Sequence, residues 1–488
     1  MELLPLLIFI IPVIGIAAVS LIADRRMAAR VALVVSLLSL GDILWKLTSF
    51  DPNGGMQFGY DQWWVEQMGV SFAIGVDGLG MVMLLLTGAL VPLIIFSSFD
   101  REIRAHRTFY GLIFLMQAAL YGVFTATDGF LFYIFWELAL IPIWFICLLW
   151  GGADRIRITL KFFIYTLSGS LVMLVGLIWL YLQTPVPHSF SLESFYALSL
   201  TASQQSWIFW AFFLAFAIKI PVFPLHTWQP DTYTDSPTQG TMLLSGIMLK
   251  MGLYGIIRWM IPVVPDGIAE WGMLATGLAV IGVIYGSMMA IAQKDFKRLA
   301  AYSSMAHVGL IAAGIMTLNI QALQGGVFQM LSHGITAIGL FFIADILQEK
   351  LKTRYMGEMG GVSHRSRPFA ILFMIVLLGS VALPLTGGFI GEFLLLFGIY
   401  TFSPWMALFA GLSVILGAVY MLRAYKQIML GDESPIAGAF NGLTNNEKLL
   451  LIIVSILILV TGVYPQPLLD IAGPSLEQIL AKGTSVTL

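Results

Sequence analysis

Long apolar runs recur along the whole chain, and they limit the fold more than any other feature of the sequence. A helix of about 20 apolar residues is long enough to cross the hydrocarbon core of a bilayer. Only 11% of the 488 residues are charged and the mean hydropathy is +0.90, which is too few charges to cover a soluble surface of this size. The sequence therefore predicts an all-α polytopic membrane protein.

Fourteen hydrophobic segments are each expected to form one transmembrane helix. They lie near residues 3–22, 29–48, 77–98, 108–127, 129–149, 160–183, 205–222, 238–259, 271–292, 298–317, 322–347, 368–400, 404–422 and 447–464. The first segment has no basic stretch before it and no cleavage site, so we expect a retained helix. Most of the 25 Lys and Arg residues fall in alternate loops, and this pattern predicts that both termini face outside.

Two of the predicted helices are interrupted by residues that break helical hydrogen bonding. The seventh ends at Lys219-Ile220-Pro221, and the twelfth contains Pro384, Gly387 and Gly388 in its middle. Interrupted segments five helices apart are typical of inverted repeats with a transport path at the breaks. We therefore predict a single membrane domain, 1–488. It comprises helices 1–3 in 1–107, a first repeat of helices 4–8 in 108–260, a second repeat of helices 9–13 in 268–425, and a loop, helix 14 and a tail in 426–488.

Four charged residues lie inside predicted helices with apolar residues on both sides, namely Glu137, Lys219, Lys250 and Glu392. A charge at the centre of a membrane helix costs roughly 2.5–3.5 kcal/mol on insertion scales, so such residues usually face a partner or a water-filled cavity. One interpretation is a chain of groups that exchange protons. The other is two structural ion pairs that fix helix packing.

Two histidines lie near these charges in the predicted helices 10 and 11, where hydroxyl side chains accompany them. His307 and His333 have a side-chain type that is suited to a proton relay near neutral pH. The alternatives are neutral histidines bonded to a neighbouring helix, or a pair of axial haem ligands. We interpret them as relay residues.

The loop at residues 221–237 should be cytoplasmic but has no Lys or Arg, so we expect it to dip into the protein. His226, Asp231 and Asp235 in this loop could line a proton uptake path, but turn capping and loop anchoring explain them equally well. Asp77 is expected to cap the third helix and to do no chemistry. Lys46 should extend to the interface and tolerate alanine.

The chain offers little for a redox or metal centre. Cys147 is the one cysteine, which excludes an internal disulfide, a Cys-ligated iron–sulfur cluster and a thiolate zinc site. A net charge of −2 gives no indication of nucleic-acid binding. Any redox cofactor is therefore expected in another protein.

Four blocks of sequence together resemble the antiporter-like subunits shared by respiratory complex I and the Mrp-type sodium/proton antiporters. They are the stretch around Glu137, FAIKIPVFPLHTWQPDTYTDSPTQGTMLLSGIMLK at 216–250, QKDFKRLAAYSSMAHVG at 293–309, and SHG at 332–334. The resemblance covers nearly the whole chain. The L-type, N-type and Mrp members typically have lysine at the position of Glu392, whereas M-type subunits of bacterial complex I have glutamate, so the resemblance is to the M type.

The resemblance implies specific roles for the buried charges. Glu137 and Lys219 would form a pair whose separation modulates the lysine, and protons would pass laterally to Lys250 and on to Glu392. Gln229 and Tyr233 depart from the Leu and His that are common in the family, which weakens a proton-uptake role for the loop at 221–237.

The resemblance also implies a function and a setting. The chain would be a proton-translocating subunit of NADH:quinone oxidoreductase in the bacterial cytoplasmic membrane, beside L-type and N-type subunits. FMN, iron–sulfur clusters and quinone would be held by partner subunits. The alternative is a subunit of an Mrp-type sodium/proton antiporter.

Overall fold

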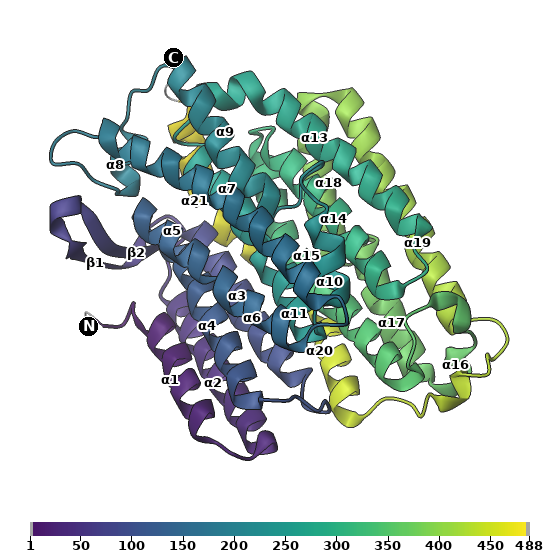
Figure 1. Ribbon diagram of the computed structural model, residues 1–488. Helices are drawn as coiled ribbons and strands as arrows, with labels where there is room; N and C mark the ends of the chain where they lie inside the picture. Colours follow the sequence, from purple (N-terminus) through teal and green to yellow (C-terminus); the bar gives the residue numbers. More distant parts are fainter. Residues whose placement is uncertain (1–2, 485–488) are drawn as a thin grey trace.

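The computed structural model describes residues 3–484 as a bundle of long, tilted helices (Figure 1). Within this part of the chain, ten helical stretches are long and apolar enough to cross a membrane. They are Arg25–Thr48, Gly78–Phe96, His106–Thr125, Gly129–Trp150, Arg155–Gln183, Thr238–Met260, Pro265–Ala292, Ile320–Leu351, Pro404–Met429 and Asn445–Val463. Leu7–Leu21, Arg367–Ser380 and Gly387–Phe402 are shorter apolar helices. The chain is a multi-pass membrane protein.

The elements follow one another with short connections. The first part comprises α1 (Leu7–Leu21), α2 (Arg25–Thr48), β1 (Gln57–Val65), η1 (Glu66–Met68), β2 (Val70–Val76), α3 (Gly78–Phe96), α4 (His106–Thr125), α5 (Gly129–Leu138), α6 (Leu140–Trp150), α7 (Arg155–Gln183), α8 (Leu192–Tyr196), α9 (Ala202–Lys219), α10 (Trp228–Asp235), α11 (Thr238–Leu243), η2 (Leu244–Met248), α12 (Lys250–Gly255) and η3 (Ile256–Met260). The second part comprises α13 (Pro265–Ala292), α14 (Phe296–Ile315), α15 (Ile320–Leu351), η4 (Met356–Glu358), α16 (Val362–Arg365), α17 (Arg367–Ser380), α18 (Gly387–Phe402), α19 (Pro404–Met429), η5 (Ala437–Ala439), α20 (Asn445–Val463) and α21 (Gln466–Thr484).

Both predicted helix interruptions are present. The chain leaves α9 at Lys219 and becomes helical again only in α10, and it leaves α17 at Ser380 and resumes in α18. Glycine is favoured at the second break because neighbouring side-chain and backbone atoms leave little room for a Cβ there. A Cβ on Gly387 would lie 2.4 Å from Thr461 Oγ1, and one on Gly388 would lie 2.6 Å from the Gly379 carbonyl oxygen.

Two further irregularities were not expected from the sequence. The predicted fifth helix is divided at Ala139, where Pro142 lacks the N–H that would bond to the Leu138 carbonyl. The predicted eighth helix contains two π turns, η2 and η3, on either side of α12. Such turns are often found at functional sites.

A β-hairpin corrects the prediction of an all-α fold. Strands β1 and β2 pair antiparallel, with Tyr60 opposite Ile74 and Trp63 opposite Ser71. This stretch is too polar to cross a membrane and is rich in the aromatic and β-branched residues that favour strands. Isolated bridges join Ile74 to Ala126 and Asp128 to Ser191, so the hairpin, the α4–α5 connection and the segment before α8 meet at one end of the bundle (Figure 1).

The C-terminal residues form a helix, α21, where the sequence predicted only a tail. This helix packs against α3 and α15. The Gly78 N–H at the start of α3 donates to Ser475 Oγ at 2.8 Å. A Cβ on Gly78 would lie 1.9 Å from the Ile471 carbonyl oxygen, so only glycine permits this approach.

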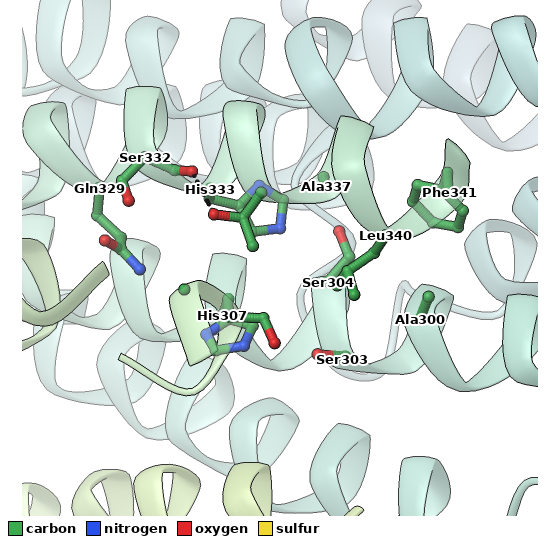
Figure 2. A pocket seen from close by; sticks show the side chains of 13 residues that line it. Ala300, Ser303, Ser304, His307, Gln329, Ser332, His333, Ala337, Leu340 and Phe341 are labelled. Carbon is green, nitrogen blue, oxygen red and sulfur yellow. Dashed lines mark hydrogen bonds between the residues drawn. The ribbon is translucent and has the colours of Figure 1, made fainter. Parts of the chain in front are cut away.

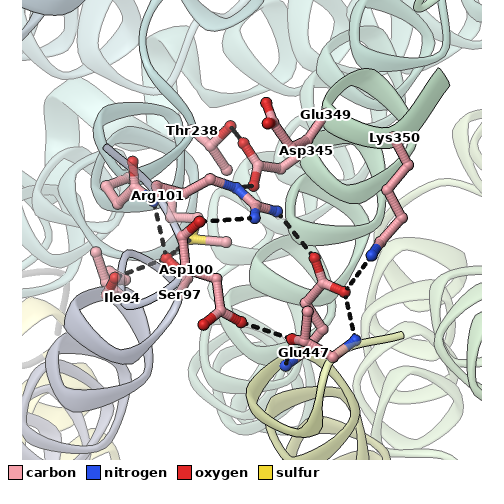
Figure 3. Close-up of polar contacts among 12 residues, drawn as sticks. Ile94, Ser97, Asp100, Arg101, Thr238, Asp345, Glu349, Lys350 and Glu447 are labelled. Carbon is pink, nitrogen blue, oxygen red and sulfur yellow. Dashed lines mark hydrogen bonds and ion pairs between the residues drawn. The ribbon is translucent and has the colours of Figure 1, made fainter. Parts of the chain in front are cut away.

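A partly buried network of charges ties helix ends together near the start of α11 (Figure 3). Arg101 Nε lies 2.8 Å from Asp345 Oδ2, and its Nη2 lies 3.2 Å from Glu447 Oε1. Lys350 Nζ lies 3.0 Å from Glu447 Oε2, and Thr238 Oγ1 donates to Asp345 Oδ1 at 2.6 Å. Two cations balance two carboxylates, so the network joins the α3–α4 connection, α11, α15 and α20 without a net charge.

Candidate functional site

Glu137 and Lys219 approach each other across α5 and α9 but do not form an ion pair in the part of the chain that the structure describes. Glu137 is half-buried one residue before the end of α5, and its Oε1 is buried without a hydrogen-bond partner. Its polar neighbours are Ser170 of α7 and the charge of Lys219. Lys219 is 2% exposed, and its Nζ lies 5.3 Å from the centre of the Trp136 ring.

Lys250 is fixed by the π turn that precedes it. In this turn the Leu249 N–H bonds to the Leu244 carbonyl oxygen, one residue further back than in an α-helix, which takes this donor away from the Ser245 carbonyl. The Lys250 ammonium donates to that Ser245 oxygen at 2.5 Å. Its Nζ also lies 2.9 Å from His333 Nδ1 on α15. The side chain is fully buried.

Glu392 lies in the first turns of α18, directly after the Pro/Gly break, and pairs with the other histidine. His307 Nδ1 on α14 is 2.8 Å from Glu392 Oε1. Gln329 of α15 donates to the same oxygen through Nε2 at 3.4 Å. Glu392 is 4% exposed, so His307 and Gln329 supply hydrogen-bonding partners for a carboxylate that is shielded from solvent.

The two histidines bring the two halves of this arrangement together. The ring centres of His307 and His333 are 6.1 Å apart. The order in space is therefore Lys250, His333, His307 and Glu392, across η2–α12, α15, α14 and α18. The sequence placed all four residues in buried helices, but it could not show which of them touch.

A small cavity lies beside the two histidines (Figure 2). Its volume of about 20 Å³ is enough for about one water molecule. His307, Ser332, His333 and Ser304 line it, together with Gln329. His307 Nε2 and Gln329 Oε1 are buried without a hydrogen-bond partner among the described residues, so the cavity offers polar atoms that a water could bridge.

The residues of the loop at 221–237 lie apart from this line. Asp231 binds Lys161 Nζ at 3.0 Å and Arg298 Nη2 at 3.0 Å, which anchors α10 to α7 and α14. The Asp235 carbonyl oxygen accepts from the Gly152 N–H at 2.8 Å. His226 is buried between aromatic rings, 5.5 Å from Phe223. These ion pairs support the interpretation that Asp231 anchors the loop.

The prediction that Lys46 reaches the interface is wrong. The side chain is 1% exposed and pairs with Asp42 one turn earlier on α2. The prediction considered Lys46 alone and overlooked its partner, Asp42. Its spacing of four residues places both groups on one helix face, and this was the available sequence signal.

A second buried pair was also missed. Asp77 caps α3 as predicted, since its Oδ1 accepts from the Gly80 N–H at 3.0 Å. The same oxygen lies 2.5 Å from Arg258 Nη2 in η3. Arg258 lies in the same hydrophobic segment as Lys250, and an arginine in such a segment was the signal that could have found it.

Together, the broken helices and the buried Lys–His–His–Glu line define a multi-pass membrane protein of the antiporter-like class. The family model for "NADH:quinone oxidoreductase/Mrp antiporter, TM" matches residues 126–417. The chain belongs to this family.

Relatives make the assignment more specific. The chain is 39% identical over 460 residues to NADH-quinone oxidoreductase subunit M of Rickettsia typhi, covering 93% of this chain and 92% of the relative. A chain of respiratory complex I from Thermus thermophilus superposes with a TM-score of 0.87 at 32% identity, covering 98% of this chain and 99% of that one. The resemblance to M-type subunits is thereby confirmed.

The Mrp side of the family is similar in fold alone. A chain of the Mrp complex from Dietzia sp. DQ12-45-1b superposes with a TM-score of 0.85, but only 19% of residues are identical over 100% of this chain and 98% of that one. The Mrp alternative therefore has weaker support than the M-type assignment.

Proposed function

We propose that this chain is the M-type proton-translocating subunit of a bacterial NADH:quinone oxidoreductase and that it moves protons along its buried Lys, His and Glu residues. The observation that carries this proposal is the continuous order of Lys250, His333, His307 and Glu392 through the bundle. Two structural ion pairs would need no histidine between them.

The contacts give each histidine a proton donor or acceptor on a defined nitrogen. A charged Lys250 donates to His333 Nδ1, so a neutral His333 carries its hydrogen on Nε2. His307 donates from Nδ1 to the Glu392 carboxylate, which leaves its Nε2 as a proton acceptor. A proton from Lys250 can enter His333 at Nδ1 while His333 releases one from Nε2. His307 can then accept at Nε2 and release from Nδ1 to Glu392.

The gap between the two imidazoles falls beside the small cavity. A water there would carry the proton from His333 Nε2 to His307 Nε2, since both rings line this space. After each transfer both histidines have exchanged tautomers, and the rings or the proton arrangement must reset before the next proton passes. The relay therefore runs in one direction only if Lys250 regains its proton from one side.

Glu137 and Lys219 are proposed to control this recharging. A change in the distance between the Glu137 carboxylate and the Lys219 ammonium changes how firmly the lysine holds its proton. The two groups already act on each other through their charges without being bonded. Pro221, Pro384, Gly387 and Gly388 lie at the two helix breaks, where movement of these helices is easiest.

The architecture fits a larger scheme that we also propose. Fourteen spans would include two inverted repeats, 108–260 and 268–425, with both termini on the outer face of the bacterial cytoplasmic membrane. L-type and N-type subunits would lie beside the chain. FMN, iron–sulfur clusters and quinone would reside in partner subunits, which supply the redox energy.

Copurification and vesicle assays test this function. The tagged chain should bring down a large assembly that contains flavin and iron–sulfur subunits, and inverted vesicles should acidify during NADH oxidation by quinone. Recovery in a small assembly that has no flavin and exchanges sodium for protons would contradict the proposal and favour the Mrp alternative.

A further inference from the structure

The partner of Lys219 in this structure is an aromatic ring, and this ring belongs to the residue next to Glu137. The Lys219 Nζ lies 5.3 Å from the Trp136 ring centre. No hydrogen bond or ion pair engages this ammonium within residues 3–484. A buried cation over an indole face is stabilised by the ring quadrupole, and tryptophan is the strongest natural partner of this kind.

The ring is held rigidly in this position. Trp136 is 3% exposed, and its ring centre lies 5.7 Å from that of Phe132 and 5.6 Å from that of Phe216. Phe216 lies three residues before Lys219, on the same side of α9. The aromatic contacts therefore fix the indole and the lysine stem relative to one another.

The helix that carries Trp136 and Glu137 ends directly after them. Only Ala139 separates α5, which ends at Leu138, from α6, which begins at Leu140, and Pro142 has no N–H to bond to the Leu138 carbonyl, so a backbone hydrogen bond is missing directly after Glu137. The indole is anchored by its neighbours, whereas Glu137 Oε1 has no hydrogen-bond partner. The lysine thus has two adjacent partners, an indole packed between aromatic rings and a carboxylate with one oxygen that has no hydrogen-bond partner.

We propose that Trp136 is a positioning residue that holds the charged Lys219 away from Glu137, so that the lysine alternates between the indole face and the carboxylate. This inference rests on the proposed function and deepens it, because it names the group that stabilises the separated state. Without the ring, the separated lysine would be a buried cation with no stabilising contact, and the pair would remain closed.

Site-specific replacement of Trp136 by fluorinated tryptophans tests the idea in the assembled complex. Successive fluorine atoms weaken the negative ring face while the shape of the side chain changes little. We expect NADH-driven proton pumping to fall stepwise along the series, to about a fifth or less with the most fluorinated ring. Trp136→Phe should retain more activity than Trp136→Leu at equal assembly, because phenylalanine keeps an aromatic face.

Trp259 provides the matched control. Its ring packs against the same Phe132 at 5.0 Å, and no cation lies over its face among the described residues. Fluorination there should leave pumping unchanged. Lys219→Ala is measured in parallel. If this variant pumps normally, the proposed function fails. If it is inactive while the Trp136 series stays flat, only the role of the ring is overturned.

Discussion

His307 and Glu392, 85 positions apart in the sequence, are joined by a contact of 2.8 Å between Nδ1 and Oε1. This contact places a titratable ring on one side of the carboxylate and Gln329 on another. Substitution can tell whether Glu392 exchanges protons or only packs, because a proton-exchanging residue must be able to gain and lose a proton and a packing residue need not.

Glu392→Gln should assemble normally and lose at least about tenfold in coupled activity, since an amide keeps the shape but cannot carry a proton. Glu392→Asp should keep part of the activity. NADH oxidation and a pH-sensitive dye in inverted vesicles measure both, after equal amounts of complex have been confirmed. Equal gradients for wild type and the Gln variant would remove Glu392 from the pathway.

His333→Gln is expected to stop proton transfer while keeping a hydrogen bond to Lys250. The glutamine oxygen can accept from the ammonium, but the amide cannot take a proton at one atom and release it from another. Pumping should fall at least about tenfold at normal assembly. Ser287→Ala, which removes a buried hydroxyl on α13 that donates to the Val283 carbonyl oxygen and lies outside the lining of the cavity, serves as the control and should stay close to wild type.

Lys219→Ala and Glu137→Ala should each reduce quinone-dependent NADH oxidation and pumping several-fold, because transport and electron transfer are coupled. Lys352→Ala is a suitable control, since this lysine is 72% exposed and pairs only with Glu349 within the described residues. Near-normal rates in either fully assembled variant would refute the modulating pair.

Lys46→Ala should destabilise the protein, because it leaves the Asp42 carboxylate buried without its cation. The cost of breaking a buried pair is about 3–5 kcal/mol. Thermal unfolding in detergent should show a lower Tm for Lys46→Ala and recovery in the double variant Lys46→Met with Asp42→Leu. An unchanged Tm for the single variant would show that the pair contributes nothing.

Hydropathy and helix-breaking residues were enough to predict a multi-pass helical membrane protein and both interruptions, because these depend on local sequence. Of the fourteen predicted spans, the described residues give ten helical stretches long and apolar enough to cross a membrane, and the count of fourteen stays a prediction. The β-hairpin and α21 were missed because neither has the length and hydropathy of a membrane helix. Lys46 was misread because its position near a helix end suggested exposure, whereas burial depends on the neighbours α3 and α4. The contact between Lys250 and His333 bridges 83 positions, and a single sequence contains no signal for such pairing.

The polar network around Arg101 has a mechanical consequence. Thr238 and Lys250 are twelve residues apart on one helical stretch, and Asp345 and His333 are twelve apart on α15. The hydrogen bonds Thr238–Asp345 and Lys250–His333 therefore join the two helices at points about 18 Å apart along their length. Between these two hydrogen bonds the helices pack closely, since a Cβ on Gly334 would lie 2.8 Å from the Gly246 carbonyl oxygen. Sliding one helix along the other would strain both hydrogen bonds at once, so this pair of bonds resists any change in the distance between Lys250 and His333.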